Sequence, residues 1–126
     1  MAAFSRDVFE AAAGEREVLL TTRGRKTGKA HRVVLWIASD GKRVYIRSGA
    51  GMNRDWAQNL VAAGAGELAM AGRKLKVQPR HLTEPAEARG VSALYRTKYG
   101  GQVKQSDPSE APTPAETATF ELLPAE

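Results

Sequence analysis

The side chains with the clearest chemical potential are cations and glycines that gather between positions 23 and 32. Half of these positions are cationic and no acid interrupts them: Arg23, Arg25, Lys26, Lys29 and Arg32. Glycine lets backbone amides approach an anion closely, arginine presents a planar fork of donors, and lysine adds a compact charge. With the Thr27 hydroxyl and the flexible Gly28 among them, these residues predict a loop that cradles a phosphate.

The spacing in this loop excludes one familiar phosphate motif and leaves a plain alternative open. The stretch from Gly24 to Lys29 lacks the four-residue gap that precedes Gly-Lys-Ser/Thr in the nucleotide-binding P-loop. The alternative is a solvated hairpin surface whose charges only keep the protein soluble.

A second stretch that favours anions runs from Ser48 to Asn53 and leads into a predicted helix that Asn53 would cap. Unpaired amides and the dipole at a helix N-terminus attract negative groups. We therefore expect Ser48, Gly49, Ala50 and Gly51 to lie beside the same ligand. The alternative is an ordinary turn between a strand and a helix.

Two tryptophans could present a ring surface, but their surroundings favour the core. Trp56 shares one helix face with Leu60 and Ala63, and Trp36 lies within an apolar strand. We expect Trp36 in the core, and we retain Trp56 and its neighbour Asn59 as candidates for contact with an aromatic ligand.

The remaining titratable candidates lack obvious partners in the sequence. His31 has no neighbouring acid or nucleophile and is expected to be a polar residue at a strand end, while His81 is expected at the surface. Tyr95 and Tyr99 lie four apart on one predicted helix face, a spacing at which aromatic side chains usually pack together. Tyr99 is the weak candidate for a catalytic group.

Periodicity and turn signals outline the β-rich domain that must position these residues. Strands are predicted from β-branched, aliphatic or alternating residues at 17–22, 32–38, 44–48, 68–70, 75–79 and 118–123. Asp40-Gly41 indicates a tight hairpin between the second and third strands. Helices are predicted at an N-terminal helix or arm (1–14), at 53–64 and at 85–100. The segment 102–117 is rich in Pro, Ser and acids and predicts a long mobile loop.

Length and composition limit the class of protein. A chain of 126 residues is expected to form one domain, 1–126. The lack of cysteine excludes disulfides, thiolate nucleophiles and Cys-ligated zinc, and two separated histidines argue against a metal site. No apolar run reaches the length of a membrane-spanning helix and no signal-peptide core is evident, so we expect a cytoplasmic protein without a transmembrane segment. Peripheral contact with a membrane stays open.

The net charge of +5 and the pI of about 9.8 would attract polyanions. The positive charge is nevertheless local, since acids dominate after Lys104. Nucleic acid is one such polyanion, but the sequence has neither an RNA-recognition signature nor exposed aromatics interleaved with the basic loop. We therefore expect a small-molecule ligand and no nucleic acid.

Four motifs occur in a characteristic order along the chain: TTRGRKTGK (21–29), HRVVLW (31–36), SGAG (48–51) and DWAQNL (55–60). Their order and spacing resemble the deazaflavin-dependent nitroreductase and quinone reductase family. The likeness covers roughly residues 16 to 82, with a weaker echo in the last strand. It implies an α+β fold, mainly β: a split β-barrel of antiparallel strands with about two to three flanking helices.

The resemblance also implies a cofactor, coenzyme F-420, whose polyglutamate tail suits a basic surface. Its phosphate would be bound by Arg25, Lys26, Thr27, Gly28 and Lys29, with either His31 or Arg32. Its deazaflavin ring or linker would be lined by Ser48, Gly49, Ala50, Gly51, Trp56 and Asn59. The implied reaction is hydride transfer from the reduced deazaflavin to a quinone, enone or nitroaromatic, with solvent or Tyr99 as proton source.

The sequence is compatible with other functions. The barrel could be a non-catalytic carrier of a cofactor or lipid, or it could use FMN as cofactor, since fold alone does not determine chemistry. Related barrels occur as monomers and as homodimers. The sequence also departs from the family: Val34 replaces a frequent proline, and His31 replaces a frequent arginine. Because neighbouring strand residues face opposite ways, His31 and Arg32 cannot both face one phosphate from a regular strand, and the choice stays open.

Overall fold

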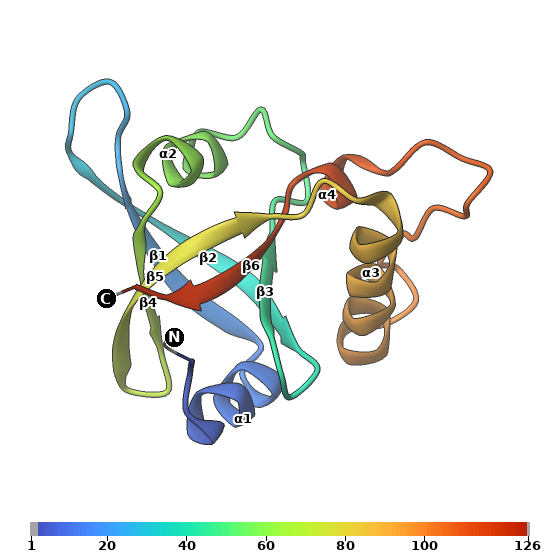
Figure 1. Cartoon of the computed structure of the whole chain (residues 1–126), viewed down its shortest axis with the longest axis horizontal. Coiled ribbons are helices and arrows are strands. Elements are labelled where there is room, and N and C mark those ends of the chain that lie inside the picture. The colour runs from blue at the N-terminus through green and yellow to red at the C-terminus, as the bar shows by residue number, and fades with distance from the viewer. Residues whose placement is uncertain (1–2, 126) are drawn as a thin grey trace.

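The structure is a computed structural model that describes residues 3–125. It forms a closed barrel of six antiparallel strands with four helices around it (Figure 1). The elements along the chain are α1 (Arg6–Gly14), β1 (Glu17–Arg23), β2 (Ala30–Ser39), β3 (Val44–Arg47), α2 (Asp55–Ala63), β4 (Gly66–Met70), β5 (Arg73–His81), α3 (Pro85–Tyr99), α4 (Pro114–Thr117) and β6 (Thr119–Pro124). The predicted α+β split-barrel architecture is confirmed, with α4 as an additional helix.

The barrel closes because the strands pair in the order β1-β2-β3-β6-β5-β4 and β4 returns to β1. Closure leaves no free sheet edge. Alternate residues of each strand point inward and fill the barrel with aliphatic side chains and one phenylalanine: Val18, Leu20, Leu35, Ile37, Val44, Ile46, Leu68, Met70, Val77, Phe120 and Leu122.

Two helices cover the ends of the barrel (Figure 1). Helix α1 buries Val8 and Ala12 against the core at one end, and α2 buries Ala57 and Leu60 at the other. Helix α1 ends at Gly14, as the expected N-terminal helix or arm does, while Met1 and Ala2 of the expected segment 1–14, and Glu126 of the expected domain, lie outside the described residues.

The outer face of the barrel has its own small core under α3. Strand β3 is buried at every position because Tyr45 and Arg47, which point away from the barrel interior, are covered by this helix. Lys98 on α3 donates hydrogen bonds to the carbonyl of Ala12 at 3.0 Å and to that of Ile37 at 2.8 Å. Helix α3 thus ties α1 to β2.

Several local predictions were wrong. Trp36 is 42% exposed, because it lies on the outer face of β2, where its ring stacks on Tyr99 with centroids 4.2 Å apart. Asn53 does not cap α2; Arg54 holds that position and no side chain caps the helix. Ala63 faces solvent at the end of α2. His81 is half-buried, stacked on Phe120 with its Nε2 2.7 Å from the carbonyl of Thr117.

Helix α4 ends the segment 102–117. Its first turn carries a capping box in which Thr113 and Glu116 each bond the other's backbone amide. The mobility of the segment stays a prediction. Within residues 3–125, no helix combines the length and the apolar character needed to cross a lipid bilayer.

Candidate ligand-binding site

A cleft of about 590 Å³ opens where β2, the end of β3 and the start of α2 meet, and we name it the first cleft. Its volume lies in the range of small-molecule pockets. Six predicted site residues line it: His31, Arg32, Ser48, Gly49, Ala50 and Trp56. The sequence missed others that share it: Val33, Val34, Leu35, Arg47, Arg54 and Asp55. Three separate sequence motifs, 31–36, 48–51 and 55–60, thus meet at one site.

The basic loop between β1 and β2 docks onto α2 through Arg25. Asn59 is 3% exposed, and its Oδ1 accepts hydrogen bonds from the backbone N of Arg25 at 3.1 Å and from its guanidinium at 2.8 Å. The same guanidinium reaches Asp55 at 3.4 Å. Neither Arg25 nor Asn59 is among the residues that line the first cleft. This pair therefore positions the loop beside the cleft.

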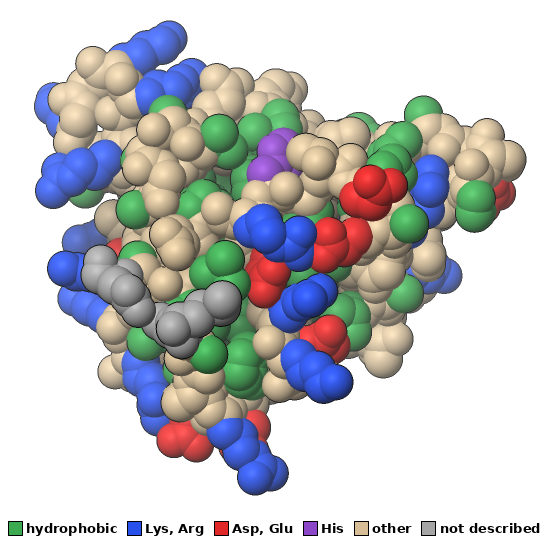
Figure 2. All heavy atoms as spheres, in the orientation of Figure 1, with side chains coloured by type: hydrophobic (Ala, Val, Ile, Leu, Met, Phe, Trp, Pro, Cys, Tyr) green, Lys and Arg blue, Asp and Glu red, His purple; other side chains and the backbone are tan. Residues whose placement is uncertain are grey.

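The tip of this loop projects beyond the barrel, where blue side chains gather at the upper left of Figure 2. Lys26, Thr27, Gly28 and Lys29 are all exposed there. Gly28 has a φ of +71°, a conformation that favours glycine, and its amide bonds the carbonyl of Gly24. The tip presents cations at the surface without lining the first cleft.

His31 and Arg32 both border the first cleft, yet their environments differ. The His31 imidazole lies against the backbone of Gly24, so close that a Cβ added to Gly24 would stand 3.0 Å from Nε2. Arg32 is exposed and, within residues 3–125, its guanidinium makes no hydrogen bond or ion pair. Arg32 is thus a cation in this cleft that is free to meet an anion.

The turn after β3 places a buried polar atom at the first cleft. Ser48 is 2% exposed and its Oγ has no hydrogen-bond partner among the described residues. An unpaired buried hydroxyl is costly unless a ligand or water satisfies it. Gly49 has nothing within 4 Å of the position a Cβ would take, so the backbone is open there. This pair of features fits a ligand that takes one hydrogen bond from Ser48 and lies flat over Gly49.

Gly51 has a different role from its neighbours. Its φ of +95° strongly favours glycine, and an added Cβ would also lie only 3.3 Å from the Cβ of Pro114 in α4. Gly51 is buried and closes the turn by donating to the carbonyl of Ser48 at 3.1 Å. It shapes the turn and does not line the first cleft.

Helix α2 begins at the edge of the first cleft. Trp56 is half-buried in its first turn and packs against Phe120, with ring centroids 6.1 Å apart, while also lining the cleft. Arg54 lies at the N-cap of α2. The positive end of the helix and this cation both favour an anion. The sequence does hold a signal for Arg54 as a site residue, because this cation stands between a Gly-rich turn and the start of a predicted helix.

Arg47, another lining residue that was not predicted from the sequence, is 8% exposed. Its guanidinium donates to Thr119 Oγ1 at 3.1 Å, Ser92 Oγ at 2.9 Å and the carbonyl of Ala88 at 3.2 Å. Ser92 in turn donates to Glu116 at 2.8 Å. A buried polar network thus runs from the first cleft to α4. The network is visible only in the tertiary structure, because its residues are far apart in the sequence.

Glu116 anchors this network. It is 1% exposed, and its carboxylate accepts from Ser106 Oγ at 2.6 Å, Thr113 N at 2.8 Å and Ser92 Oγ at 2.8 Å. Burial by itself raises the pKa of this carboxyl, but the hydrogen bonds from Ser106, Thr113 and Ser92 outweigh it and lower the pKa to about 2. Glu116 is therefore ionised at neutral pH.

Tyr99 is buried, and backbone groups surround its hydroxyl. The Oη atom lies 2.7 Å from the carbonyls of Arg16 and Ile37 and accepts from the amide of Ile37 at 3.0 Å. Burial raises the pKa of this phenol. These contacts indicate that Tyr99 holds α3 on the barrel. A role of Tyr99 in proton transfer stays a prediction.

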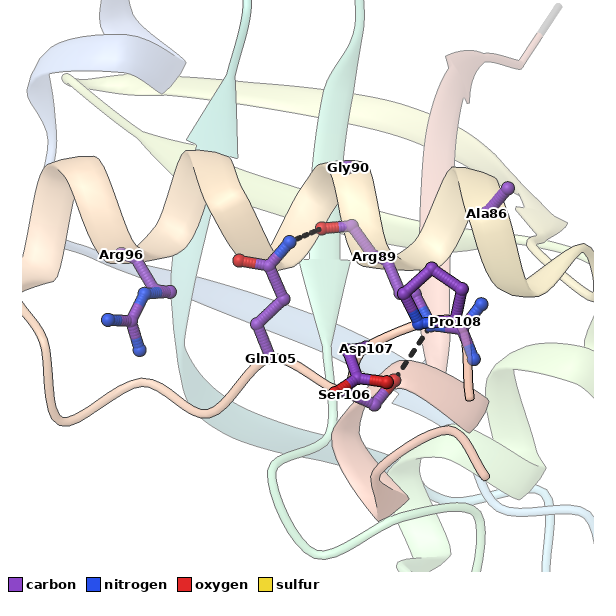
Figure 3. A pocket seen from close by; sticks show the side chains of 8 residues that line it. All are labelled: Ala86, Arg89, Gly90, Arg96, Gln105, Ser106, Asp107 and Pro108. Carbon is purple, nitrogen blue, oxygen red and sulfur yellow. Dashed lines mark hydrogen bonds between the residues drawn. The ribbon is translucent and has the colours of Figure 1, made fainter. Parts of the chain in front are cut away.

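A groove of about 740 Å³ lies between α3 and the segment that follows the helix (Figure 3). Arg89 donates to Ser106 Oγ at 2.8 Å and Gln105 donates to the carbonyl of Arg89 at 3.3 Å. These contacts fasten the segment to α3. No residue from the predicted site lines the groove.

Solved structures of several proteins resemble this fold. HutZ, the heme storage protein from Vibrio cholerae, has a TM-score of 0.69 and 11% identity, covering 99% of this chain and 92% of its own. A protein named an F-420 reductase has a TM-score of 0.60 and 14% identity, covering 100% and 97%. A FAD-binding protein from Mesorhizobium loti has a TM-score of 0.61 and 14% identity, covering 99% and 93%. The split-barrel fold and the resemblance seen in the motifs are confirmed at the level of the fold.

The sequence comparisons are narrower. Among curated proteins, no sequence matches this chain. One family matches over residues 9–122, which is most of the 126 residues. The chain therefore belongs to the family described as uncharacterized proteins conserved in bacteria (DUF2255), and it folds as a split β-barrel.

Proposed function

We propose that this protein binds coenzyme F-420 in the first cleft and reduces a small organic acceptor such as a quinone, an enone or a nitroaromatic. The observation that carries the proposal is the meeting, in one cleft, of the unpaired Ser48 hydroxyl, the open backbone at Gly49 and the unpaired cation Arg32. A planar ring with a phosphorylated side chain suits this set of groups. The F-420 reductase among the structural neighbours supports the choice of cofactor.

The positions of the cations suggest where the phosphate and the acidic tail of the cofactor bind. Arg32 and Arg54 at the cleft, with the α2 N-terminus, bind the phosphate, since each is a donor free to meet it. Arg25 holds the loop in place through Asn59. The exposed Lys26 and Lys29 at the loop tip attract the acidic tail through long-range Coulomb forces that salt weakens.

The ring portion lies against the turn 48–50 and Trp56. Ser48 supplies one hydrogen bond, Gly49 permits close approach, and Trp56 supplies an apolar wall. When bound and reduced, the deazaflavin supplies a hydride from its C5 position. The chain's own residues orient the ring and exclude water from one of its faces. Solvent at the open side of the cleft delivers the proton, since Tyr99 is engaged with backbone groups.

A fluorescence titration with oxidised F-420, run in parallel with FMN, tests the proposal. Arg32→Ala is expected to weaken F-420 binding about tenfold, the size of one lost charge-assisted contact. Lys42→Ala is the matched control, because Lys42 is an exposed cation on the distant β2–β3 turn. Equal affinity for F-420 in both variants would remove the phosphate role of Arg32.

The same titration separates the competing cofactors. Tight FMN binding with no F-420 binding would favour an FMN-dependent reductase, an alternative that the FAD-binding neighbour makes reasonable. Binding of F-420 without turnover across quinones, enones and nitroaromatics would favour a non-catalytic carrier, and a heme storage protein is among the structural neighbours. Absence of binding to either cofactor would overturn the proposal.

A further inference from the structure

A second cleft of about 630 Å³ adjoins the first and shares four residues with it: Val34, Leu35, Arg47 and Gly49. It lies between the outer face of β2 and the segment around α4. Its other lining residues are Trp36, Tyr95, Gln102, Val103, Lys104, Thr113, Pro114 and Ala115. A ligand in this second cleft would therefore lie beside any ligand in the first.

The floor of the second cleft is apolar and flat. Trp36 is 42% exposed and its ring is stacked on Tyr99 with an interplanar angle of 7°. Val34 beside it on β2 is 60% exposed. Exposed large apolar side chains that line a cavity mark a binding surface for an apolar partner. A planar ring system matches this floor.

One wall of the second cleft carries a rigid, buried cation. The Arg47 guanidinium is stacked on the ring of Tyr95 at 4.9 Å and makes its three hydrogen bonds to neutral groups. A guanidinium has five N–H donors, so two of them have no acceptor among residues 3–125. Donors held in this way need no reorganisation to meet a ligand.

The charges around the second cleft are unbalanced. Lys104 is an exposed cation at its rim, and none of its lining residues carries a carboxylate. The nearest acid in the network, Glu116, is separated from Arg47 by Ser92 and is saturated by its own donors. Burial lowers the pKa of the Arg47 guanidinium, while the charge of Glu116 acts in the opposite direction without reversing the shift.

We infer that the second cleft selects planar aromatic carboxylates, with the ring on Trp36 and Val34 and the carboxylate on Arg47. That such a molecule is the hydride acceptor rests on the proposed function; that it binds here does not. A neutral ring of the same size leaves the free donors of Arg47 buried without a partner, and sites built on such donors discriminate strongly against analogues that cannot satisfy them. Lys104 adds a weaker, salt-sensitive attraction.

Calorimetric titration of the protein without cofactor tests this inference with a matched pair of probes, 2-naphthoate and 2-naphthalenemethanol. Both place the same ring on the floor, and only the first carries a charge. We expect 2-naphthoate to bind at least tenfold more tightly. Arg47→Met should abolish the preference, and Lys104→Glu should reduce it several-fold without changing the affinity for the alcohol. Arg6→Met is the matched control, since Arg6 is an exposed residue of α1.

Two results overturn the inference: equal affinity of the wild-type protein for the two probes, or an unchanged preference in Arg47→Met. If Arg47→Met does not fold, Lys104→Glu, at an exposed position, still decides whether charge governs binding. The F-420 titration is independent of this one. If the protein prefers 2-naphthoate but does not bind F-420, the cofactor proposal alone is overturned. If it binds F-420 but shows no preference for 2-naphthoate, the inference about the second cleft alone is overturned.

Discussion

Arg25 and Arg47 both join distant parts of the chain, Arg25 on the surface loop and Arg47 beneath α3. Arg25 keeps a side chain that is 26% exposed, and it contacts Asn59 and the 87% exposed Asp55. Arg47 is 8% exposed and belongs to a network that ends at the saturated carboxylate of Glu116. Water competes with the first set of contacts and is excluded from the second.

This barrel keeps the contacts that serve binding apart from those that serve stability. Ion pairs that water reaches contribute little to folding, because solvation and side-chain entropy offset the attraction. Buried groups that lose one partner cost much more, since the remaining donors cannot return to water. The loop can therefore change its contacts when a ligand binds, whereas the network beneath α3 must stay intact for α3, α4 and β3 to remain in place.

The largest expected effect breaks the buried network. Glu116→Gln should lower the free energy of unfolding by about 3 kcal/mol, because an amide presents donors to Ser106, Ser92 and the Thr113 amide that need acceptors. Urea or thermal unfolding measures this. Glu110→Gln is the matched control at an exposed position of the same segment. A loss below 1 kcal/mol for Glu116→Gln would contradict the structural role of the network.

The pH dependence of stability follows from the same carboxylate. The folded pKa of Glu116 is about 2, below the ordinary value of a free glutamate near 4.5, so its contribution is present above pH 5 and is lost as the pH falls. Between pH 5 and pH 3 we expect this group to account for roughly 2 kcal/mol. Unfolding curves of wild type and Glu116→Gln across this range measure it. Parallel curves for the two proteins would argue against the lowered pKa.

A smaller effect on folding and a larger one on binding are expected at the surface loop. Arg25→Ala should cost about 1 kcal/mol of stability, because the Asn59 carbonyl keeps its bond from the backbone amide of residue 25. The loop loses its orientation, so F-420 affinity should fall about fivefold. The two quantities are measured by urea unfolding and by the fluorescence titration. A stability loss as large as that of Glu116→Gln would erase the contrast between the two regions.

The smallest expected effect is at the acid that Arg25 reaches. Asp55→Asn should change the free energy of unfolding by less than about 0.5 kcal/mol, since Asp55 is 87% exposed and the contact is 3.4 Å long. Removing a negative charge from the lining of the first cleft should strengthen F-420 binding about twofold. Weaker binding in Asp55→Asn would show that the carboxylate itself positions Arg25.

Local patterns were sufficient for most of the elements. The alternating residues of β1 and β2, the Asp40-Gly41 hairpin, and the Pro85 start and Gly100 end of α3 all lie where their sequence signals predict. Turn chemistry and periodicity act between near neighbours, which is why they are readable from the chain. Arg32, Ser48 and Trp56 were likewise predicted near one ligand, and they share the first cleft.

Tertiary structure decided what depends on residues far apart. Trp36 reads as core within its strand but faces outward, because its inward neighbours Leu35 and Ile37 already fill the barrel. Arg47 lies in a predicted strand and Glu116 in a predicted loop, yet both are buried, and their partners come from α3 and from distant parts of the chain. By itself the sequence determined which strands and loops form and where positive charge gathers. Only closure of the barrel and packing of α3 on it determined which side chains are buried and which distant residues pair, because burial and pairing depend on all the neighbours at once.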